Sequence, residues 1–184
     1  MKRIITFEEL KQFSNFRKIY ESSEHLMKTA MESASYANVF LSHSSKDKDK
    51  LVDVISFLES YGAEVYIDKN DKDLPKITNY NTAKILKERI NSIPKFILFV
   101  TPNSKDSRWI PWELGLADGI GKYKNIAILP ASNYQYDSNW TEQEYLGLYQ
   151  QIIWGKPDNE DIEDLVVFDR FNNKKVYLRE WLYE

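Results

Sequence analysis

The residues whose types and spacing best suit chemistry lie in one short stretch, residues 107–114, with the sequence Ser-Arg-Trp-Ile-Pro-Trp-Glu-Leu. Pro111 fits the first turn of a helix, where its missing N–H costs little. Trp109, Trp112 and Glu113 then fall near one face at helical spacing, which predicts a carboxylate beside two indoles. Burial by the indoles would raise the pKa of this carboxylate, and the helix dipole would lower it. Glu113 is therefore the candidate catalytic carboxylate.

The same stretch has a second interpretation, a core helix with one glutamate on its surface. Tryptophan usually packs inside a protein and glutamate usually faces water, so the motif alone favours this second interpretation. The rest of the chain has to decide between the two.

Polar residues also follow three segments with the character of strands. The loops are residues 42–45, the stretch from Asp68 to Ile77, and residues 101–110. In an open parallel sheet, ligands bind beyond the carboxyl ends of the strands, so the three loops predict a binding cleft. The serines of the first loop and Asp47 have an alternative role in turns and as caps of the next helix.

The elements that position these loops alternate between strand and helix. The apolar patterns predict strands over 38–42, 63–67, 96–100 and 126–130, and helices over 47–61, 78–91 and 111–119. Gly62 is placed to end the first of these helices. The wholly apolar segment 96–100 is typical of a strand buried on both faces. The alternation predicts an α/β fold with a central parallel sheet and helices on both faces.

The two ends of the chain differ from this core. Residues 1–36 are expected to form a helical extension, beginning at a capping box over residues 6–9 and continuing in a second helix near residues 22–33. The less regular part, 131–184, is expected to hold strands near 151–154 and 165–168 and a last helix near 174–182. We therefore divide the chain into the extension 1–36 and one domain, 37–184, whose core motifs span 37–130.

Composition excludes several classes of protein. The net charge of −3 disfavours a nucleic-acid partner, which usually requires a basic face. The chain has no cysteine, which rules out disulfides and cysteine-rich zinc sites. The longest apolar runs are strand-sized and the N-terminus lacks the apolar core of a signal peptide, so we expect a cytoplasmic protein without a membrane partner.

Other ligand sites are also disfavoured. The acidic loop after residue 67 lacks the glycine and the late glutamate of a calcium-binding EF-hand, so we expect no metal. Asp68 at a strand end could suggest a phosphate acceptor, but that chemistry would want an acidic pair where Ser42, His43 and Ser44 stand. No phosphate-binding loop or dinucleotide fingerprint is present, so we expect no bound cofactor.

Three of these segments resemble the Toll/interleukin-1 receptor (TIR) family. Residues 39–48 are similar to its opening strand and loop, F-[IL]-S-[HY]-x-x-x-D, and residues 61–68 to its second strand, which precedes the loop called BB. Residues 107–114 are similar to the plant pattern S-x-W-C-L-x-E-L, and Trp109 and Glu113 match the bacterial pattern W-x-x-x-E. The three motifs occur in the family's order and spacing on the predicted strand–helix alternation.

The resemblance implies a flavodoxin-like TIR fold and an enzyme that cleaves NAD, an NAD glycohydrolase or ADP-ribosyl cyclase. The family's catalytic glutamate corresponds to Glu113. The substrate-binding residues expected beside it are Ser42, His43, Ser44, Asp68, Trp109 and Trp112. NAD is then the substrate, and neither a metal nor a cofactor is required.

A single glutamate is chemically adequate for this reaction. Glycoside hydrolases need a second carboxyl group to protonate the leaving oxygen. The nicotinamide of NAD is already cationic and departs as a neutral molecule without a proton donor. One carboxylate that binds the ribose hydroxyls and stabilises the oxocarbenium-like transition state is therefore sufficient.

The resemblance also implies a biological role. Stand-alone TIR proteins of this size resemble those of bacterial anti-phage systems such as Thoeris, which make an ADP-ribose-derived signal, cyclic or conjugated, for a separate effector protein. We also expect self-association through the loop from Asp68 to Ile77. Two alternatives belong to other classes, a non-catalytic TIR adaptor acting by TIR–TIR contact and a nucleoside deoxyribosyltransferase-like enzyme.

Overall fold

A computed structural model of the 184-residue chain describes residues 2–18, 22–32, 36–68, 80–139, 143–157 and 160–184. Within these residues, the strands form one sheet in the order β3-β2-β4-β5-β6-β7-β8, with the short β1 paired to β5. The strands are β1 (Ile5–Thr6), β2 (Val39–Ser42), β3 (Val65–Tyr66), β4 (Lys95–Val100), β5 (Ile126–Ser132), β6 (Gln150–Gly155), β7 (Asp164–Asp169) and β8 (Lys174–Tyr177). The helices are α1 (Phe7–Lys18), α2 (Ser23–Glu32), α3 (Leu51–Ser60), α4 (Tyr80–Ser92), α5 (Ile110–Gly119) and α6 (Leu178–Tyr183). Short 3₁₀ helices are η2 (Ser45–Lys50), η3 (Ser104–Asp106), η4 (Tyr123–Asn125) and η6 (Glu144–Leu148).

The central part of the sheet is parallel, as predicted. Strands β3, β2, β4, β5 and β6 pair in parallel. The predicted strand–helix alternation is confirmed, and Gly62, with φ of 96°, follows the end of α3 in a conformation that favours glycine.

The C-terminal part corrects the sequence prediction. Strands β6, β7 and β8 pair antiparallel, so the sheet is mixed. We expected a helix over 174–182, but residues 174–177 form β8, and the helix α6 begins at Leu178. A tight turn supported by the Asp169 carboxylate, which accepts hydrogen bonds from Phe171 and Asn172, returns the chain onto β7. This pairing decides the structure of a segment whose pattern is also compatible with a helix.

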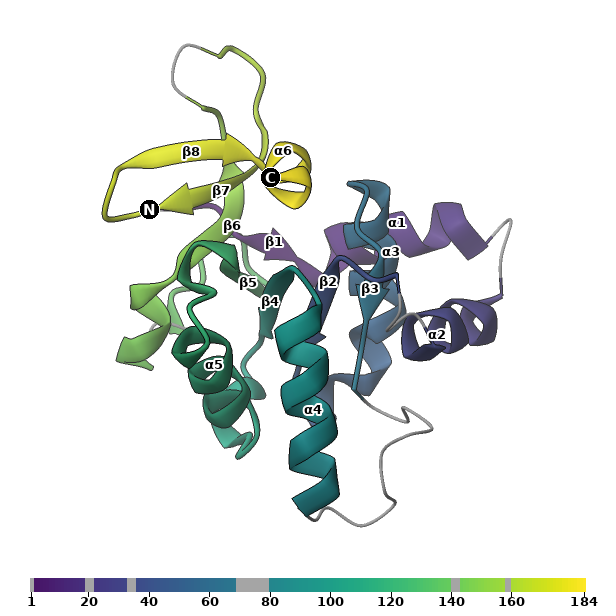
Figure 1. Cartoon of the computed structure of the whole chain (residues 1–184). Helices are drawn as coiled ribbons and strands as arrows, with labels where there is room; N and C mark the ends of the chain where they lie inside the picture. Colours follow the sequence, from purple (N-terminus) through teal and green to yellow (C-terminus); the bar gives the residue numbers. More distant parts are fainter. Residues whose placement is uncertain (1, 19–21, 33–35, 69–79, 140–142, 158–159) are drawn as a thin grey trace.

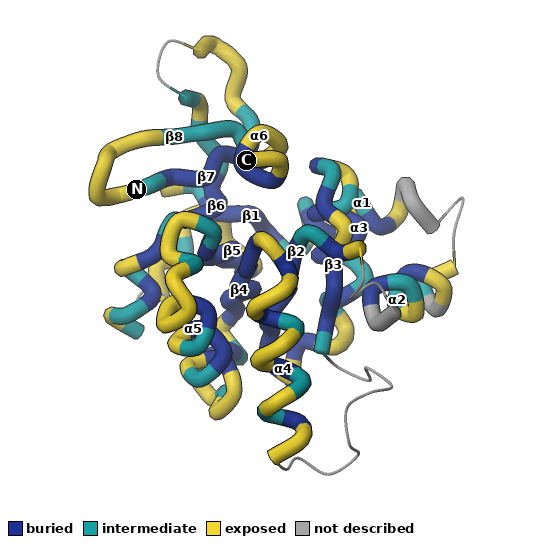
Figure 2. The backbone as a smooth tube through the Cα atoms, in the orientation of Figure 1, coloured by how far each residue is buried: buried dark blue, intermediate teal, exposed yellow. Residues whose placement is uncertain are grey.

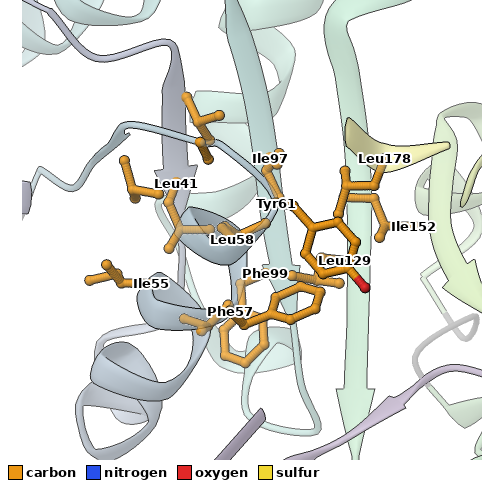
Figure 3. Packing of buried hydrophobic residues seen from close by; sticks show 14 of the residues in the cluster. Leu41, Ile55, Phe57, Leu58, Tyr61, Ile97, Phe99, Leu129, Ile152 and Leu178 are labelled. Carbon is orange, nitrogen blue, oxygen red and sulfur yellow. The ribbon is translucent and has the colours of Figure 1, made fainter. Parts of the chain in front are cut away.

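Helices cover both faces of the sheet (Figures 1 and 2), and an apolar layer lies on each face. Helices α1, α2, α3 and α6 contribute to the layer on one face, and α4 and α5 pack on the other. Figure 3 shows the first layer, where Phe57 of α3 and Tyr61, the residue after this helix, pack with Ile97 and Phe99 of β4. Side chains along a strand alternate between the faces, so Leu41 belongs to the first layer and Phe40 to the second.

The N-terminal segment is joined to the sheet and to α3. The predicted capping box is confirmed, since the Glu9 backbone N–H donates to Thr6 Oγ1 and the Thr6 backbone N–H donates to Glu9 Oε2. The short strand β1, which ends at the cap residue Thr6, pairs with the end of β5. Phe13 of α1 packs edge-on against Phe57, with ring centroids 5.2 Å apart.

The loop for which we predicted self-association lies almost wholly outside the described residues, and only Asp68 can be placed. None of the helices in the described ranges has the length and apolar character needed to cross a membrane.

Candidate active site

Glu113 lies in the buried stripe of α5. The residues of this helix that are buried are Ile110, Glu113, Leu114 and Ala117, which have the spacing of a face packed on a sheet. Glu113 is only 3% exposed, so the interpretation as a surface glutamate is wrong. Trp109 is 38% exposed and Trp112 is partly buried, because the buried face is centred on Ile110 and Leu114.

Ser42 holds the Glu113 side chain from the end of β2. Its hydroxyl donates a 2.5 Å hydrogen bond to Glu113 Oε2. Strand alternation explains the contact, since Ser42 lies two residues after Phe40 and points to the same face, where α5 packs. This bond fixes the orientation of the Glu113 carboxyl group, and it is strongest when that group is ionised.

The electrostatic balance at Glu113, which the sequence left open, favours the neutral form. Burial raises the pKa of the Glu113 carboxyl well above its usual range, and the nearby negative charge of Asp68 raises it further. The hydrogen bond from Ser42 acts in the opposite direction and lowers the pKa. A glutamate in such a balance is a candidate functional group, because strongly perturbed carboxyls gather at active sites.

A cavity of about 330 Å³ opens beside Glu113 at the carboxyl ends of β2 and β4. Its lining consists of His43, Ser45, Asp68, Asp106, Ser107, Arg108, Trp109 and Glu113. The cavity therefore draws on all three loops that the sequence singled out. It combines carboxylates, an imidazole, a guanidinium and an indole, and these groups suit a ligand with hydroxyl and phosphate groups.

The predicted substrate-binding residues divide into three groups. His43, Asp68 and Trp109 line the cavity. Ser42 lies behind Glu113 as its hydrogen-bond donor. Ser44 and Trp112 are absent from the cavity lining.

The sequence reasoning missed four lining residues, namely Ser45, Asp106, Ser107 and Arg108. All four belong to the loops predicted to form the cleft. Their position in a loop that follows a strand was therefore the feature of the sequence that could have identified them. What the sequence lacked was the side-chain direction within each loop, because loops have no fixed periodicity.

Trp112 packs edge-on against Trp109, with ring centroids 5.4 Å apart, and supports the indole that lines the cavity. The edge-to-face geometry is a favourable arrangement for two aromatic rings.

A buried carboxylate connects the first and third loops. Asp47 is fully buried, and its two oxygens accept hydrogen bonds of 2.7 Å from Thr101 Oγ1 and from Asn103 Nδ2. The alternative role in capping is confirmed for Ser44, which accepts from the Lys46 backbone N–H at the start of η2, but it is wrong for Asp47, whose oxygens bond to the third loop instead. The Asp47 carboxylate is used to hold the loop after β4 against the loop after β2.

A second connection between these loops lies at the surface. Lys46 Nζ and Asp106 Oδ2 form an ion pair at 2.5 Å, with both side chains more than half exposed. Asp106 lines the cavity, so this pair stands at the rim. The two connections hold together two of the three loops that line the cavity.

No group of three or more histidine, cysteine, aspartate or glutamate side chains in the described part of the chain is arranged to hold a metal ion. The prediction that the reaction needs no metal stays a prediction. Because Glu113 stands at a helix start beside a polar cavity, the site can stabilise a cation that develops on a bound sugar.

Comparison with known proteins points to one family. The model of the TIR domain matches residues 39–166. The chain is 33% identical over 182 residues, covering 94% of this chain and 93% of the relative, to a protein of Bacillus cereus (strain MSX-D12) named "Probable 3' cyclic ADP-D-ribose synthase ThsB'". It is 31% identical over 127 residues, covering 61% of this chain and 34% of the relative, to the "Putative cyclic ADP-D-ribose synthase TIR2" of Cytobacillus dafuensis.

Proposed function

The chain belongs to the TIR domain family, and from that membership we propose that it cleaves NAD, releases nicotinamide and closes the ADP-ribose into a cyclic product. The similarity extends over nearly the whole of the Bacillus cereus relative, whose name describes a cyclic ADP-D-ribose synthase. NAD is the substrate in this proposal, and no other cofactor takes part.

The observation that carries the proposal is the buried Glu113 carboxylate beside the cavity, held by Ser42. When the bond between nicotinamide and ribose breaks, its electron pair leaves with the ring, which becomes neutral nicotinamide. The ribose carbon then bears positive charge, and an ionised Glu113 stabilises it at close range in surroundings of low dielectric. The ground state does not contain this sugar cation, so the interaction favours the transition state.

The size and lining of the cavity agree with this assignment. A volume of about 330 Å³ is at the small end of ligand pockets, which suits the nicotinamide–ribose end of NAD. The rest of the dinucleotide then extends across the rim, where the exposed guanidinium of Arg108 is placed to bind a phosphate. Trp109 supplies an aromatic wall that limits access of water to the reacting carbon.

We further propose that the product is a signal for a separate effector protein in anti-phage defence, made in the cytoplasm. Self-association through the loop from Asp68 to Ile77 belongs to the same proposal.

The test is nicotinamide release from NAD by the purified protein, dilute and under crowding, followed by liquid chromatography. We expect Glu113→Ala to slow release by about 10²–10³-fold, as loss of a transition-state electrostatic contact does. Glu8→Ala, which removes an exposed carboxylate from α1, is the matched control and should behave as wild type. Equal rates for wild type and Glu113→Ala would reject the enzymatic proposal, and turnover of deoxynucleosides instead of NAD would indicate a deoxyribosyltransferase.

A further inference from the structure

We propose that His43 is the base that removes the proton from the attacking ribose hydroxyl when the cyclic product closes. The product is then linked through a ribose oxygen and not through an adenine nitrogen. This inference rests on the proposed function, because it concerns the step that follows release of nicotinamide.

His43 is placed for this step by the end of β2. It follows Ser42 directly, it is 9% exposed, and it lines the same cavity as Glu113 and Asp68. Its Nδ1 lies 3.4 Å from the carbonyl oxygen of Leu41. A proton on Nδ1 that is donated to this carbonyl leaves the lone pair of the neutral imidazole on Nε2, and such backbone contacts are how proteins set the tautomer of a histidine.

The chemistry of ring closure explains why a base is useful. A ribose hydroxyl that attacks the cationic carbon forms a new C–O bond and must lose its proton, which we assign to His43 Nε2 and then to solvent. NAD thus yields neutral nicotinamide, a cyclic ADP-ribose closed by an O-glycosidic bond between its two riboses, and one proton. An adenine ring nitrogen attacks with a lone pair that carries no proton, so closure through nitrogen would need no base at this point.

The two carboxylates of the cavity are less suited to this task. Glu113 accepts a hydrogen bond from Ser42 and has to stay negative while the cation exists, because protonation would remove the charge that stabilises it. Asp68 contributes to the same negative field around Glu113. The chain has two histidines, and the other one, His25, lies exposed on α2.

The Bacillus cereus relative agrees with an oxygen linkage, since its name describes a 3' cyclic product and the 3' position belongs to a ribose.

The experiment measures two quantities in the same reaction of the full chain with NAD. The rate of nicotinamide release reports bond cleavage, and the ratio of cyclic product to linear ADP-ribose, separated by chromatography and identified by mass spectrometry, reports closure. The variants are His43→Asn, whose amide can still donate to the Leu41 carbonyl, and His43→Gln, whose amide extends towards the Nε2 position. His25→Gln is the matched control, and thermal unfolding confirms that each variant is folded.

We expect the cyclic-to-linear ratio, which is measured per nicotinamide released and so does not depend on the rate of cleavage, to fall at least about tenfold in both His43 variants, since general bases contribute about 10²–10⁴-fold. Added imidazole should restore part of the ratio in the variants, which a purely structural role of His43 would not allow. A wild-type ratio in either folded variant, or the same fall in Asp68→Asn but not in the His43 variants, would overturn the assignment. A wild-type product linked through adenine nitrogen would overturn it as well. Absence of nicotinamide release from wild type would instead reject the proposed function.

Discussion

Replacing Ser42 by alanine tests the electrostatic account of the site. The Ser42 hydroxyl donates to Glu113 Oε2 at 2.5 Å and lowers the pKa of a carboxyl that burial and Asp68 raise. A hydrogen bond to a charged group contributes about 1.5–3 kcal/mol, and a tenfold change in an equilibrium corresponds to about 1.4 kcal/mol. Ser42→Ala should therefore lower the ratio of ionised to protonated Glu113 by about 10–100-fold at a given pH.

The assay is kcat/KM for nicotinamide release as a function of pH. In the proposed mechanism catalysis requires the ionised carboxylate, so activity is expected to rise with pH through the pKa of Glu113. In Ser42→Ala this rise should move to higher pH, with activity recovering at the alkaline end. Asp68→Asn removes the neighbouring negative charge and should move the rise to lower pH, whatever its effect on the maximum. If Ser42→Ala lowered kcat/KM by one factor at every pH, Ser42 would not act through the ionisation of Glu113.

Three further predictions concern stability. Burial raises the pKa of Glu113, so the stability that its neutral form supplies is complete below the ordinary value of 4.5 and is lost as the pH rises through the raised one. Glu113→Gln, which does not titrate, should thus gain Tm over wild type with rising pH, and a constant difference in thermal unfolding would contradict this. Asp47→Ala leaves the buried hydroxyl of Thr101 and the part-buried amide of Asn103 without their acceptor, so we expect a loss of about 3 kcal/mol and a Tm lower by about 6–12 °C, and an unchanged Tm would refute the role of this carboxylate. Gly62→Ala and Gly121→Ala, both at positive φ, should each cost about 1–2 kcal/mol in denaturant unfolding. The costs should be similar, because the new Cβ at Gly62 meets only the exposed end of Tyr183, and a much larger cost at Gly62 would show that this side chain cannot move.

The central fold could be predicted because the apolar residues within each of its strands and helices have the spacing typical of that element. An apolar run predicts β4 as a buried strand. Helical spacing predicts both α3 and its buried face, which consists of Leu51, Val54, Ile55 and Leu58. Strand β8 could not be predicted in this way, because its pairing with β7 is a tertiary contact. The two-residue strand β1 is too short for any periodicity to show, and its partner β5 lies more than a hundred residues away in the chain.

The site was predictable where a residue's position follows from its element. Glu113 was singled out by its place in a motif, and three other predicted residues line the same cavity. The role of Asp47 could not be foreseen, because its partners Thr101 and Asn103 lie 54 and 56 residues further along the chain. An aspartate near a helix start is usually a cap, and only the packing of two loops reveals the other role.

The register of the sheet determines whether Glu113 has a hydrogen-bond donor beside it. Ser42 pairs with Leu98 of β4, and both side chains point to the face on which α5 packs. A shift of β2 by one residue would turn Ser42 to the opposite face and leave Glu113 buried without this donor. Such a carboxyl would hold its proton more strongly and would lose its value as a stabiliser of positive charge. The same register places His43 one residue beyond the strand, in the lining of the cavity. The proposed bond cleavage at Glu113 and the proposed proton transfer at His43 therefore depend on one alignment of β2 with β4.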